Sequence, residues 1–348
     1  MASLARPFVS IVVPCRNEER YIRRCLDSIV ATDYPLDRLE VLIVDGRSDD
    51  GTREIVEQYT SRHPWMRTLD NPKQITPAAL NIGIRGARGE LIMRMDGHAC
   101  YPPSYVSQLV TALQDTGAAA VGGRLVTLPA DESPAARAIA IAMAHPFGVG
   151  NSYFRIGVKT QRSVDHVPFF CCRKEAFARA GLFDEELVRH QDGDFSARLI
   201  KQGGRILLLP DVVAYYFARR SFRQAARMFH QYGYFKPLVA RKLGRIMTAR
   251  QLAPPALLLS LTTTGLLSAW VPAAGLLFGG ILTAYAAAVL GCSAAVARRH
   301  GAACGLAIAA LFPVLHVSYG LGFLRRVVEL ATGAARRPGS SPALPLSR

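Results

Sequence analysis

The fold is decided by residues 8–45, which read FVSIVVPCRNEERYIRRCLDSIVATDYPLDRLEVLIVD. Two apolar runs in this stretch, residues 8–13 and 39–44, have the length and β-branched composition of buried strands. Between them, residues 17–30 carry apolar side chains at helical spacing, which predicts an amphipathic helix. A strand, a helix and a second strand in this order form the repeating unit of a parallel sheet.

The same alternation continues along the chain. We expect further helices over residues 52–59, 77–86, 104–115 and 195–202, and further strands over residues 90–95, 118–128 and 205–209. This order predicts an α/β domain with a mixed, mainly parallel sheet that is flanked by helices. In such sheets, ligands bind beyond the carboxyl ends of the strands.

Charge is distributed unevenly along the 348 residues. The formal net charge is +16, yet no Asp or Glu occurs between Asp211 and Glu329. The basic stretch Arg219–Arg250 leads directly into long apolar runs, as is typical of the cytoplasmic face of a membrane. We therefore expect anionic membrane lipids as partners. We expect no nucleic acid, since a nucleic-acid binder leaves the acidic motifs described below without a role.

Three apolar runs are long enough to cross a bilayer, at about residues 252–270, 272–291 and 301–324. Residues 221–236, which precede them, predict an interfacial amphipathic helix, with an ordinary surface helix as the alternative. Three crossings would put the arginine-rich end of the chain outside, against the positive-inside rule. Either the third run is re-entrant or the first two do not cross fully.

Three acidic motifs follow predicted strands or lie in loops: VDGRSDDGT at residues 44–52, MDGH at 95–98 and QDGD at 191–194. A site for a metal-bound nucleotide explains acidic residues in such places. Asp96, with His98 two residues later, suits a divalent cation across a diphosphate. Asp192 or Asp194 suits a base that accepts a proton, while Asp194 also suits a helix N-cap before Phe195.

The order and spacing of these motifs resemble glycosyltransferase family 2, whose members have the GT-A fold. Residues 9–14 (VSIVVP), with Asn17 and Glu18, resemble the family's opening strand and nucleotide loop. Matches continue through residues 71–90 before the metal motif and through residues 181–198 around the catalytic base. The basic helix around Tyr232 and the short membrane tail look most like succinoglycan-type exopolysaccharide transferases.

The resemblance implies an inverting hexosyltransferase with Mg²⁺ or Mn²⁺ as cofactor and Asp192 as the catalytic base. It implies metal ligation by Asp96, with His98 as the second candidate ligand. The nucleotide-sugar, expected to be a UDP-sugar, would contact Pro14, Asn17, Glu18, Asp45, Asp49, Asn81 and Asp96. Candidate acceptor or membrane-proximal residues are Gln224, Arg227 and Tyr232.

Three positions depart from the family pattern. His98 replaces the usual second acidic residue, and Gln191 replaces the common Glu before the base. Met228 stands where the QxxRW box of processive synthases has Trp, which favours the addition of one sugar over polymerisation. Two alternative functions stay open: transfer directly to polyprenyl phosphate, and a catalytically silent scaffold of a polysaccharide export complex.

The resemblance and the charge pattern together predict four segments. They are a GT-A catalytic domain over residues 1–218, basic interfacial helices over 219–250, a membrane region of about three hydrophobic helices over 251–326, and a basic, flexible tail over 327–348. The expected acceptor is a polyprenyl-diphosphate-linked oligosaccharide of exopolysaccharide or cell-surface glycan synthesis. The expected location is the bacterial inner (plasma) membrane, with the catalytic domain in the cytoplasm.

Overall fold

The structure is a computed structural model that describes residues 6–246 and 248–333. Within that range the chain forms two compact units. Unit 1 holds residues up to 126 and residues 153–216, and unit 2 holds residues 127–152 and those from 217 onward. Residues 127–152 thus group with the C-terminal helices, whereas the sequence suggested one continuous segment over 1–218. The functions assigned to the segments stay predictions.

Unit 1 is built on a mixed sheet, which confirms the predicted fold class. Its parallel part runs in the order β3 (Met66–Asp70), β2 (Leu39–Asp45), β1 (Val9–Cys15) and β4 (Leu91–Arg94). The sheet continues through β8 (Phe170–Arg173), β6 (Ala120–Leu128), β9 (Ile206–Phe217) and β5 (Ala99–Cys100), with β7 (Arg162–Ser163) paired to β9. β8 is antiparallel to β4 and β6, and β9 is antiparallel to β5 and β7.

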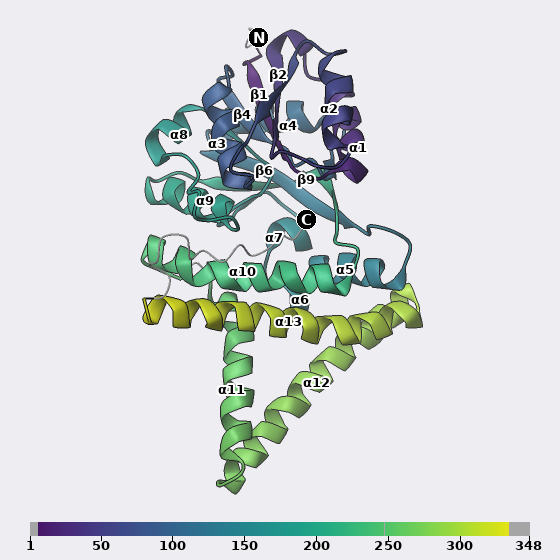
Figure 1. The fold of residues 1–348 in the computed structure, drawn as a ribbon, viewed down its shortest axis with the longest axis vertical. Helices are drawn as coiled ribbons and strands as arrows, with labels where there is room; N and C mark the ends of the chain where they lie inside the picture. Colours follow the sequence, from purple (N-terminus) through teal and green to yellow (C-terminus); the bar gives the residue numbers. More distant parts are fainter. Residues whose placement is uncertain (1–5, 247, 334–348) are drawn as a thin grey trace. The chain divides into compact units, whose positions relative to one another are not determined.

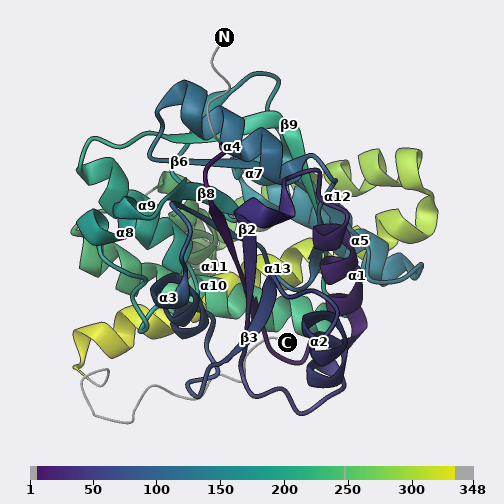
Figure 2. The same cartoon turned by 90° about the horizontal axis from the view of Figure 1, so that it is seen from above.

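Helices cover both faces of the parallel strands. α1 (Glu19–Val30) and α2 (Thr52–Thr60) lie on one face and α3 (Thr76–Gly86) lies on the other (Figures 1 and 2). Every residue of β1 and β2 is therefore buried. A Cβ atom on Gly83 of α3 would lie 2.3 Å from Cγ1 of Val12. Glycine thus allows α3 its close approach to β1.

The remaining helices of unit 1 are η1 (Leu36–Arg38), α4 (Tyr105–Thr116), α7 (Tyr153–Ile156), α8 (Glu175–Ala180) and α9 (Gln191–Lys201). α9 begins at Gln191, four residues before the predicted start, because His190 caps it in a left-handed conformation with φ of 65°. The N-cap interpretation of Asp194 is therefore wrong. Asp194 lies in the first turn, where its Oδ2 accepts from Nε of Arg198 at 3.0 Å.

Unit 2 is organised around two long helices that lie side by side, α10 (Phe222–Leu243) and α13 (Ala302–Ala331) (Figure 1). A Cβ atom on Gly233 of α10 would lie 1.9 Å from the carbonyl oxygen of Tyr319, and one on Gly322 of α13 would lie 2.1 Å from that of His230. Only glycine fits these two positions. α5 (Pro134–Ala144) and the short α6 (Pro146–Val149) complete the apolar core of this unit.

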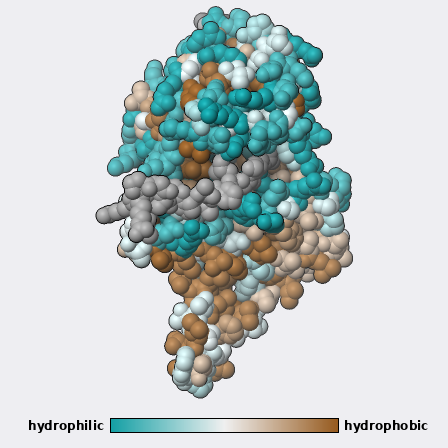
Figure 3. Space-filling view, viewed as in Figure 1, coloured by the Kyte–Doolittle hydropathy of each residue, from teal (hydrophilic) through white to brown (hydrophobic). Residues whose placement is uncertain are grey.

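After the short helix η2 (Ala249–Leu252), an apolar hairpin of α11 (Ala253–Leu267) and α12 (Pro272–His300) projects from α10 and α13 (Figure 1). Hydrophobic residues make up much of its visible surface, with paler residues among them toward the tip (Figure 3). α12 and α13 are long and apolar enough to cross a membrane. The predicted first span corresponds to α11, whose 15 residues extend about 22 Å.

The helices of the hairpin differ from α13 in their surroundings. Only 6% of the apolar window of α12 is buried, against 33% of that of α13, because α13 packs along α10. α13 also continues to Ala331, past residue 327, where the tail was predicted to start. Residues 334–348 of that predicted tail lie outside the described residues. All seven cysteines are free.

Candidate functional site

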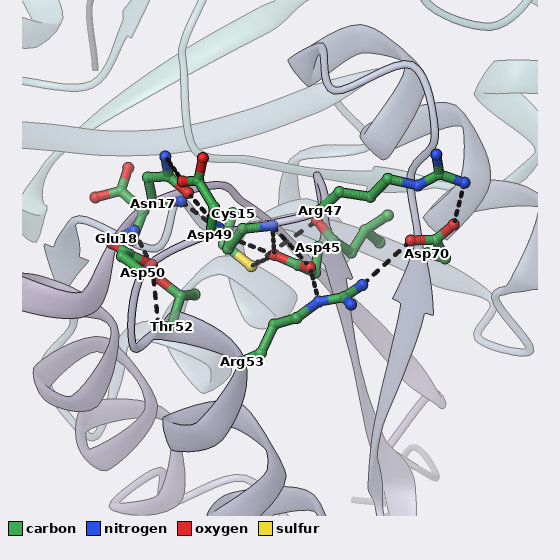
Figure 4. Close-up of polar contacts among 12 residues, drawn as sticks. Cys15, Asn17, Glu18, Asp45, Arg47, Asp49, Asp50, Thr52, Arg53 and Asp70 are labelled. Atoms are coloured by element: carbon green, nitrogen blue, oxygen red, sulfur yellow. Dashed lines mark hydrogen bonds and ion pairs between the residues drawn. The ribbon is translucent and has the colours of Figure 1, made fainter.

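The loops that follow β1 and β2 are tied together by a reciprocal pair of hydrogen bonds (Figure 4). Asn17 Nδ2 donates to Asp49 Oδ1 at 2.6 Å, and the Asp49 backbone N–H donates to Asn17 Oδ1 at 3.1 Å. Asn17 has a left-handed φ of 53°, which Asn tolerates better than most residues. The backbone N–H of Asn17 donates to Ser48 Oγ at 2.9 Å. These contacts give both loops one defined conformation.

Asp45 ends β2 and its carboxylate is buried within this rim of loops. It accepts from Ser48 Oγ at 2.5 Å and from Arg53 Nε at 2.6 Å. Arg53 Nη2 also reaches Asp70 at the end of β3, at 3.3 Å, and Arg47 reaches Asp70 at 3.4 Å (Figure 4). The carboxylate is held in one orientation at the carboxyl edge of the parallel strands, where ligands of such sheets bind.

Glu18 connects this rim to the loop that follows β4. Its backbone N–H donates to Thr52 Oγ1 at 2.8 Å, and its Oε1 lies 2.9 Å from His98 Nδ1. The His98 ring also packs edge-on against Tyr216 of β9, with 5.2 Å between ring centroids. The predicted residues Asn17, Glu18, Asp45, Asp49 and His98 therefore lie around one rim. Pro14 is buried within β1, in register with Val44.

Asp96 is engaged by a neighbouring arginine. Arg94 Nε donates to Asp96 Oδ1 at 2.8 Å and Arg94 Nη2 donates to Oδ2 at 3.0 Å. The two residues are only 6% and 9% exposed, respectively. Tyr101 Oη accepts from the backbone N–H of Asp96 at 2.7 Å. Both oxygens of Asp96, the predicted metal ligand, therefore accept hydrogen bonds from the guanidinium of Arg94. Such a bidentate arginine–carboxylate pair is strong.

Asp96 and His98 are the candidate ligands for a divalent cation in this structure. A carboxylate and an imidazole are suitable ligand types for Mn²⁺. However, both oxygens of Asp96 accept from Arg94, and His98 faces Glu18. Residues 6–246 and 248–333 contain no group of three or more His, Cys, Asp or Glu side chains placed to hold a metal ion. In this arrangement the side chains do not form a divalent-cation site.

Asp192 lies in the first turn of α9 and is half-buried. Its Oδ1 accepts from the backbone N–H of Gly193 at 2.8 Å. Burial acts to raise the pKa of Asp192, but the charges of His166, Arg94 and His190 outweigh it, so the net pKa is lowered. The side chain is therefore ionised at neutral pH and able to accept a proton.

Asn81 makes contacts that fix a different segment. Its Nδ2 donates to the Phe183 carbonyl at 2.9 Å, and the Phe183 N–H donates to its Oδ1 at 2.9 Å. Asn81 Nδ2 also donates to Glu185 Oε1 at 3.0 Å, which forms an ion pair with Lys73 at 2.6 Å. The structure thus places Asn81 of α3 against the segment that precedes α9, and not among the contacts that join the loops after β1 and β2.

The candidate acceptor residues lie on α10 in unit 2. The Gln224 side chain completes a capping box, because its Oε1 accepts from the backbone N–H of Ser221 at 3.3 Å. Arg227 is exposed, and Tyr232 packs against Phe229 with 5.7 Å between ring centroids. Met228 is 1% exposed in the apolar core of unit 2. The position at which the QxxRW box has Trp is therefore buried in the core of unit 2 in this chain.

Arg94 was not among the residues proposed from sequence. It closes the apolar strand β4 (LIMR) two residues before Asp96, and a charged residue at the end of a buried strand is the one available signal. His166 was not proposed from sequence either. It acts on Asp192, which lies 26 positions further along the chain, and no local pattern indicates this proximity.

A family model and two known proteins are similar to this chain. The model of the family described as "Glycosyl transferase family 2" matches residues 10–186. The succinoglycan biosynthesis protein ExoA of Rhizobium meliloti (strain 1021) is 30% identical over 323 residues, which cover 92% of this chain and 94% of that protein. The dolichyl N-acetyl-alpha-D-glucosaminyl phosphate 3-beta-D-2,3-diacetamido-2,3-dideoxy-beta-D-glucuronosyltransferase of Methanococcus voltae is 28% identical over 244 residues, 68% of this chain and 74% of that one.

A solved structure shows the same fold. It is the mannosyltransferase PcManGT from Pyrobaculum calidifontis in complex with GDP-Man and Mn²⁺, with a TM-score of 0.59 and 23% identity. The match covers 92% of this chain and 88% of that one. The chain has the GT-A fold, and the family model together with the ExoA relative shows that it belongs to glycosyl transferase family 2.

Proposed function

We propose that the chain transfers one hexose, with inversion, from a nucleotide-sugar to a lipid-linked oligosaccharide. One observation carries the proposal. Loops from three neighbouring strands are joined through Glu18, so that Asp45 and His98 share one rim. Asp192, which is ionised, acts electrostatically on Arg94 beside Asp96. A donor-binding rim and a nearby base are what a single displacement needs.

In the proposed reaction, Asp45 accepts hydrogen bonds from the base or the ribose of the donor, near Pro14, Asn17, Glu18 and Asp49. Asp192 takes the proton of the acceptor hydroxyl as that oxygen attacks the anomeric carbon. The bond from the anomeric carbon to the diphosphate oxygen breaks, and the nucleoside diphosphate leaves with its electron pair. One displacement at this carbon inverts its configuration.

Mg²⁺ or Mn²⁺ is the proposed cofactor, with Asp96 and His98 as the proposed ligands. Support comes from metal binding as a typical feature of the family and from the Mn²⁺ in the PcManGT complex. Because Arg94 holds Asp96 in the present arrangement, the steps above use only the chain's own residues.

The proposed acceptor is a polyprenyl-diphosphate-linked oligosaccharide of exopolysaccharide or cell-surface glycan synthesis. The printed names of the two relatives refer to succinoglycan biosynthesis and to a dolichyl-linked sugar phosphate, and both support this class. Exposed Arg223, Arg227 and Arg241 of α10 suit anionic lipid headgroups. Gln224, Arg227 and Tyr232 are therefore proposed as membrane-proximal residues.

We propose that only the α11–α12 hairpin enters the bilayer, while α13 stays packed along α10. α12 is about 43 Å long, more than the roughly 30 Å of a bilayer core. A hairpin returns the chain to its starting side, so the end of α13 and unit 1 would share the cytoplasmic side of the plasma membrane. The arginines at the end of α13 then obey the positive-inside rule. A C-terminal fluorescent protein should fluoresce and a C-terminal alkaline phosphatase should be inactive; the reverse pattern would show that α13 crosses.

The enzyme assay for the proposed function measures nucleotide release from detergent-solubilised protein with a panel of UDP- and GDP-sugars. It is run with and without Mn²⁺, and with and without bacterial lipid extract. Turnover of one donor that depends on the lipid and is lost in Asp192→Asn supports the proposal. Turnover on bare polyprenyl phosphate would favour direct transfer to the lipid, and equal background in both proteins with every lipid would favour a silent scaffold.

A further inference from the structure

Asp70, at the end of β3, lies between two guanidinium groups (Figure 4). Its Oδ1 accepts from Nη2 of Arg53 at 3.3 Å, and its Oδ2 accepts from Nη2 of Arg47 at 3.4 Å. Arg53 belongs to the first turn of α2, and Arg47 belongs to the loop after β2. Asp70 is in register with Asp45, the last residue of β2. This Arg53–Asp70–Arg47 row therefore lies at the carboxyl edge of the parallel strands, where ligands bind.

The row has hydrogen-bonding capacity that Asp45 largely lacks. The two oxygens of Asp45 each accept two bonds, from the Ser48 hydroxyl and backbone N–H and from Nε of Arg53, at 2.5–3.3 Å. Each oxygen of Asp70 accepts one bond and keeps a second lone pair. Within residues 6–246 and 248–333, Nη1 of Arg53 and Nη1 of Arg47 donate to no acceptor. The row can therefore bind a further polar group.

The row is also accessible to a ligand. The side chains of Arg47, Asp70 and Arg53 are 55%, 50% and 47% exposed, whereas that of Asp45 is 1% exposed. Ion pairs between exposed side chains contribute little to stability, so the stability of unit 1 does not explain the row. Arg47 moreover has a left-handed φ of 55°, which is unfavourable for this residue type and often marks a functional position.

The chemistry of the row follows a fixed order: Arg53 donates, Asp70 accepts and Arg47 donates. Uracil and thymine present the complementary order on the Watson–Crick edge, because their N3–H lies between two carbonyl oxygens. Cytosine has an acceptor at N3 and an amino group at C4, so it does not match. Guanine matches at its carbonyl and its N1–H, but its 2-amino group would face a guanidinium. The order therefore favours a base with two carbonyl groups.

We propose that the Arg53–Asp70–Arg47 row recognises the base of the nucleotide-sugar and selects uracil or thymine. Arg53 and Arg47 donate to the two carbonyl oxygens, and Asp70 accepts from N3–H. Asp45 holds Arg53 in place, so its proposed contact with the donor is to the ribose rather than to the base. This inference rests on the proposed function, since it takes the carboxyl edge of these strands as the donor site.

The test measures the binding of UDP, N3-methyl-UDP, CDP and GDP to the full-length protein in detergent by isothermal titration calorimetry, with the same excess of Mg²⁺ throughout. N3-methyl-UDP lacks the N3–H but keeps both carbonyl groups and the diphosphate. The wild type should bind UDP about tenfold more tightly than the other three, as expected for one hydrogen bond to a charged group. In Asp70→Ala, UDP and N3-methyl-UDP should differ less than about twofold, because the acceptor for N3–H is gone.

A second exposed ion pair of unit 1 supplies the matched control. Asp37 pairs with Arg38 at 3.8 Å in η1, which precedes β2 and so lies at the opposite end of that strand. Asp37→Ala should bind all four nucleotides as the wild type does. Arg47→Gln should lower the preference for UDP over GDP, because the glutamine oxygen can accept from the 2-amino group. If Asp70→Ala does not fold, as judged by thermal melting, Arg47→Gln decides.

Equal affinity of the wild type for UDP and N3-methyl-UDP would overturn the inference, as would tighter binding of GDP than of UDP. An unchanged UDP preference in both Asp70→Ala and Arg47→Gln would also overturn it.

Transfer assays on the same samples separate this inference from the proposed function. Hexose transfer by a wild type that binds UDP and N3-methyl-UDP equally would overturn the base recognition and leave the transferase intact. A UDP preference that depends on Asp70, in a protein that transfers no sugar under any lipid condition, would count against the proposed reaction and support the base recognition.

Discussion

The two units differ in where their apolar residues lie: unit 1 buries them in its core, whereas the hairpin of unit 2 exposes many of them. In unit 1, every residue of β1 and β2 is buried, and polar side chains gather at the loops that follow these strands. In unit 2, the hairpin of α11 and α12 exposes many of its leucines (Figure 3). Unit 1 is stabilised by excluding water from a closed core, whereas the hairpin has apolar surface with no protein cover in the described residues. Apolar composition alone does not tell a buried core from an exposed apolar hairpin. The difference lies in whether other parts of the protein cover the apolar residues.

The largest expected effect belongs to unit 1. Asp192→Asn should reduce hexose transfer by about 10²–10⁴-fold, the usual contribution of a general base. It should leave membrane attachment unchanged, because the substitution does not touch the hairpin. Transfer is measured at saturating Mn²⁺, and the membrane-bound fraction is measured after carbonate extraction. Exposed Asp37 of η1 supplies the control Asp37→Asn, and wild-type transfer by Asp192→Asn would refute the assignment of the base.

The next largest effect is expected on membrane insertion of the hairpin, and two leucines of similar exposure provide the variant and its control. Leu282 of α12 and Leu36 of unit 1 are almost equally exposed, at 45% and 46%. An arginine at the bilayer centre costs about 3 kcal/mol, so Leu282→Arg should lower membrane insertion about a hundredfold. Leu36→Arg should leave it unchanged. Equal carbonate extraction of the two variants would show that the hairpin is covered by protein rather than by lipid.

A smaller effect is expected where α13 meets α10. Gly233→Ala places a methyl group 1.9 Å from the Tyr319 carbonyl oxygen, and such overpacking costs about 1–3 kcal/mol. Gly279→Ala in α12 meets no other described atom within 4 Å and removes a helix-disfavouring glycine. Thermal unfolding should therefore shift to lower temperature for the first variant only. Equal melting temperatures would mean that α13 does not stay on α10, as a third membrane crossing would require.

The sequence predicted the elements whose burial is continuous. β1, α1 and β2 were recognised because their apolar residues follow strand or helix spacing without interruption. β3 was missed because its residues MRTLD are mostly exposed and show no apolar run. β8 was missed because FCCR is only four residues long. The start of α9 was misplaced because a left-handed His190, and not a capping side chain, begins it.

Some features of the candidate site can also be predicted from the sequence, and others cannot. The strand-end position of Asp45 and Asp96 follows from local pattern, since carboxyl ends of parallel strands share one edge. The pairing of Glu18 with His98 joins residues 80 positions apart, so no local pattern predicts it. The Arg94–Asp96 fork spans only two residues, yet it depends on burial that excludes water from the pair. Contacts of this kind follow from the folded geometry.

The smallest expected effect concerns the pH dependence of transfer, and it tests how unit 1 supports its base. His166, Arg94 and His190 lower the pKa of Asp192 against the effect of burial, so the rate should persist to lower pH than with an ordinary aspartate. His166→Gln removes the largest of these charges and should raise the pKa of Asp192. The acidic limb of the rate profile then moves to higher pH, so activity falls in acidic buffer and changes little at neutral pH. His63→Gln, on the loop between α2 and β3, is the control. An acidic limb that is identical in both variants and the wild type would show that His166 does not act on the catalytic base.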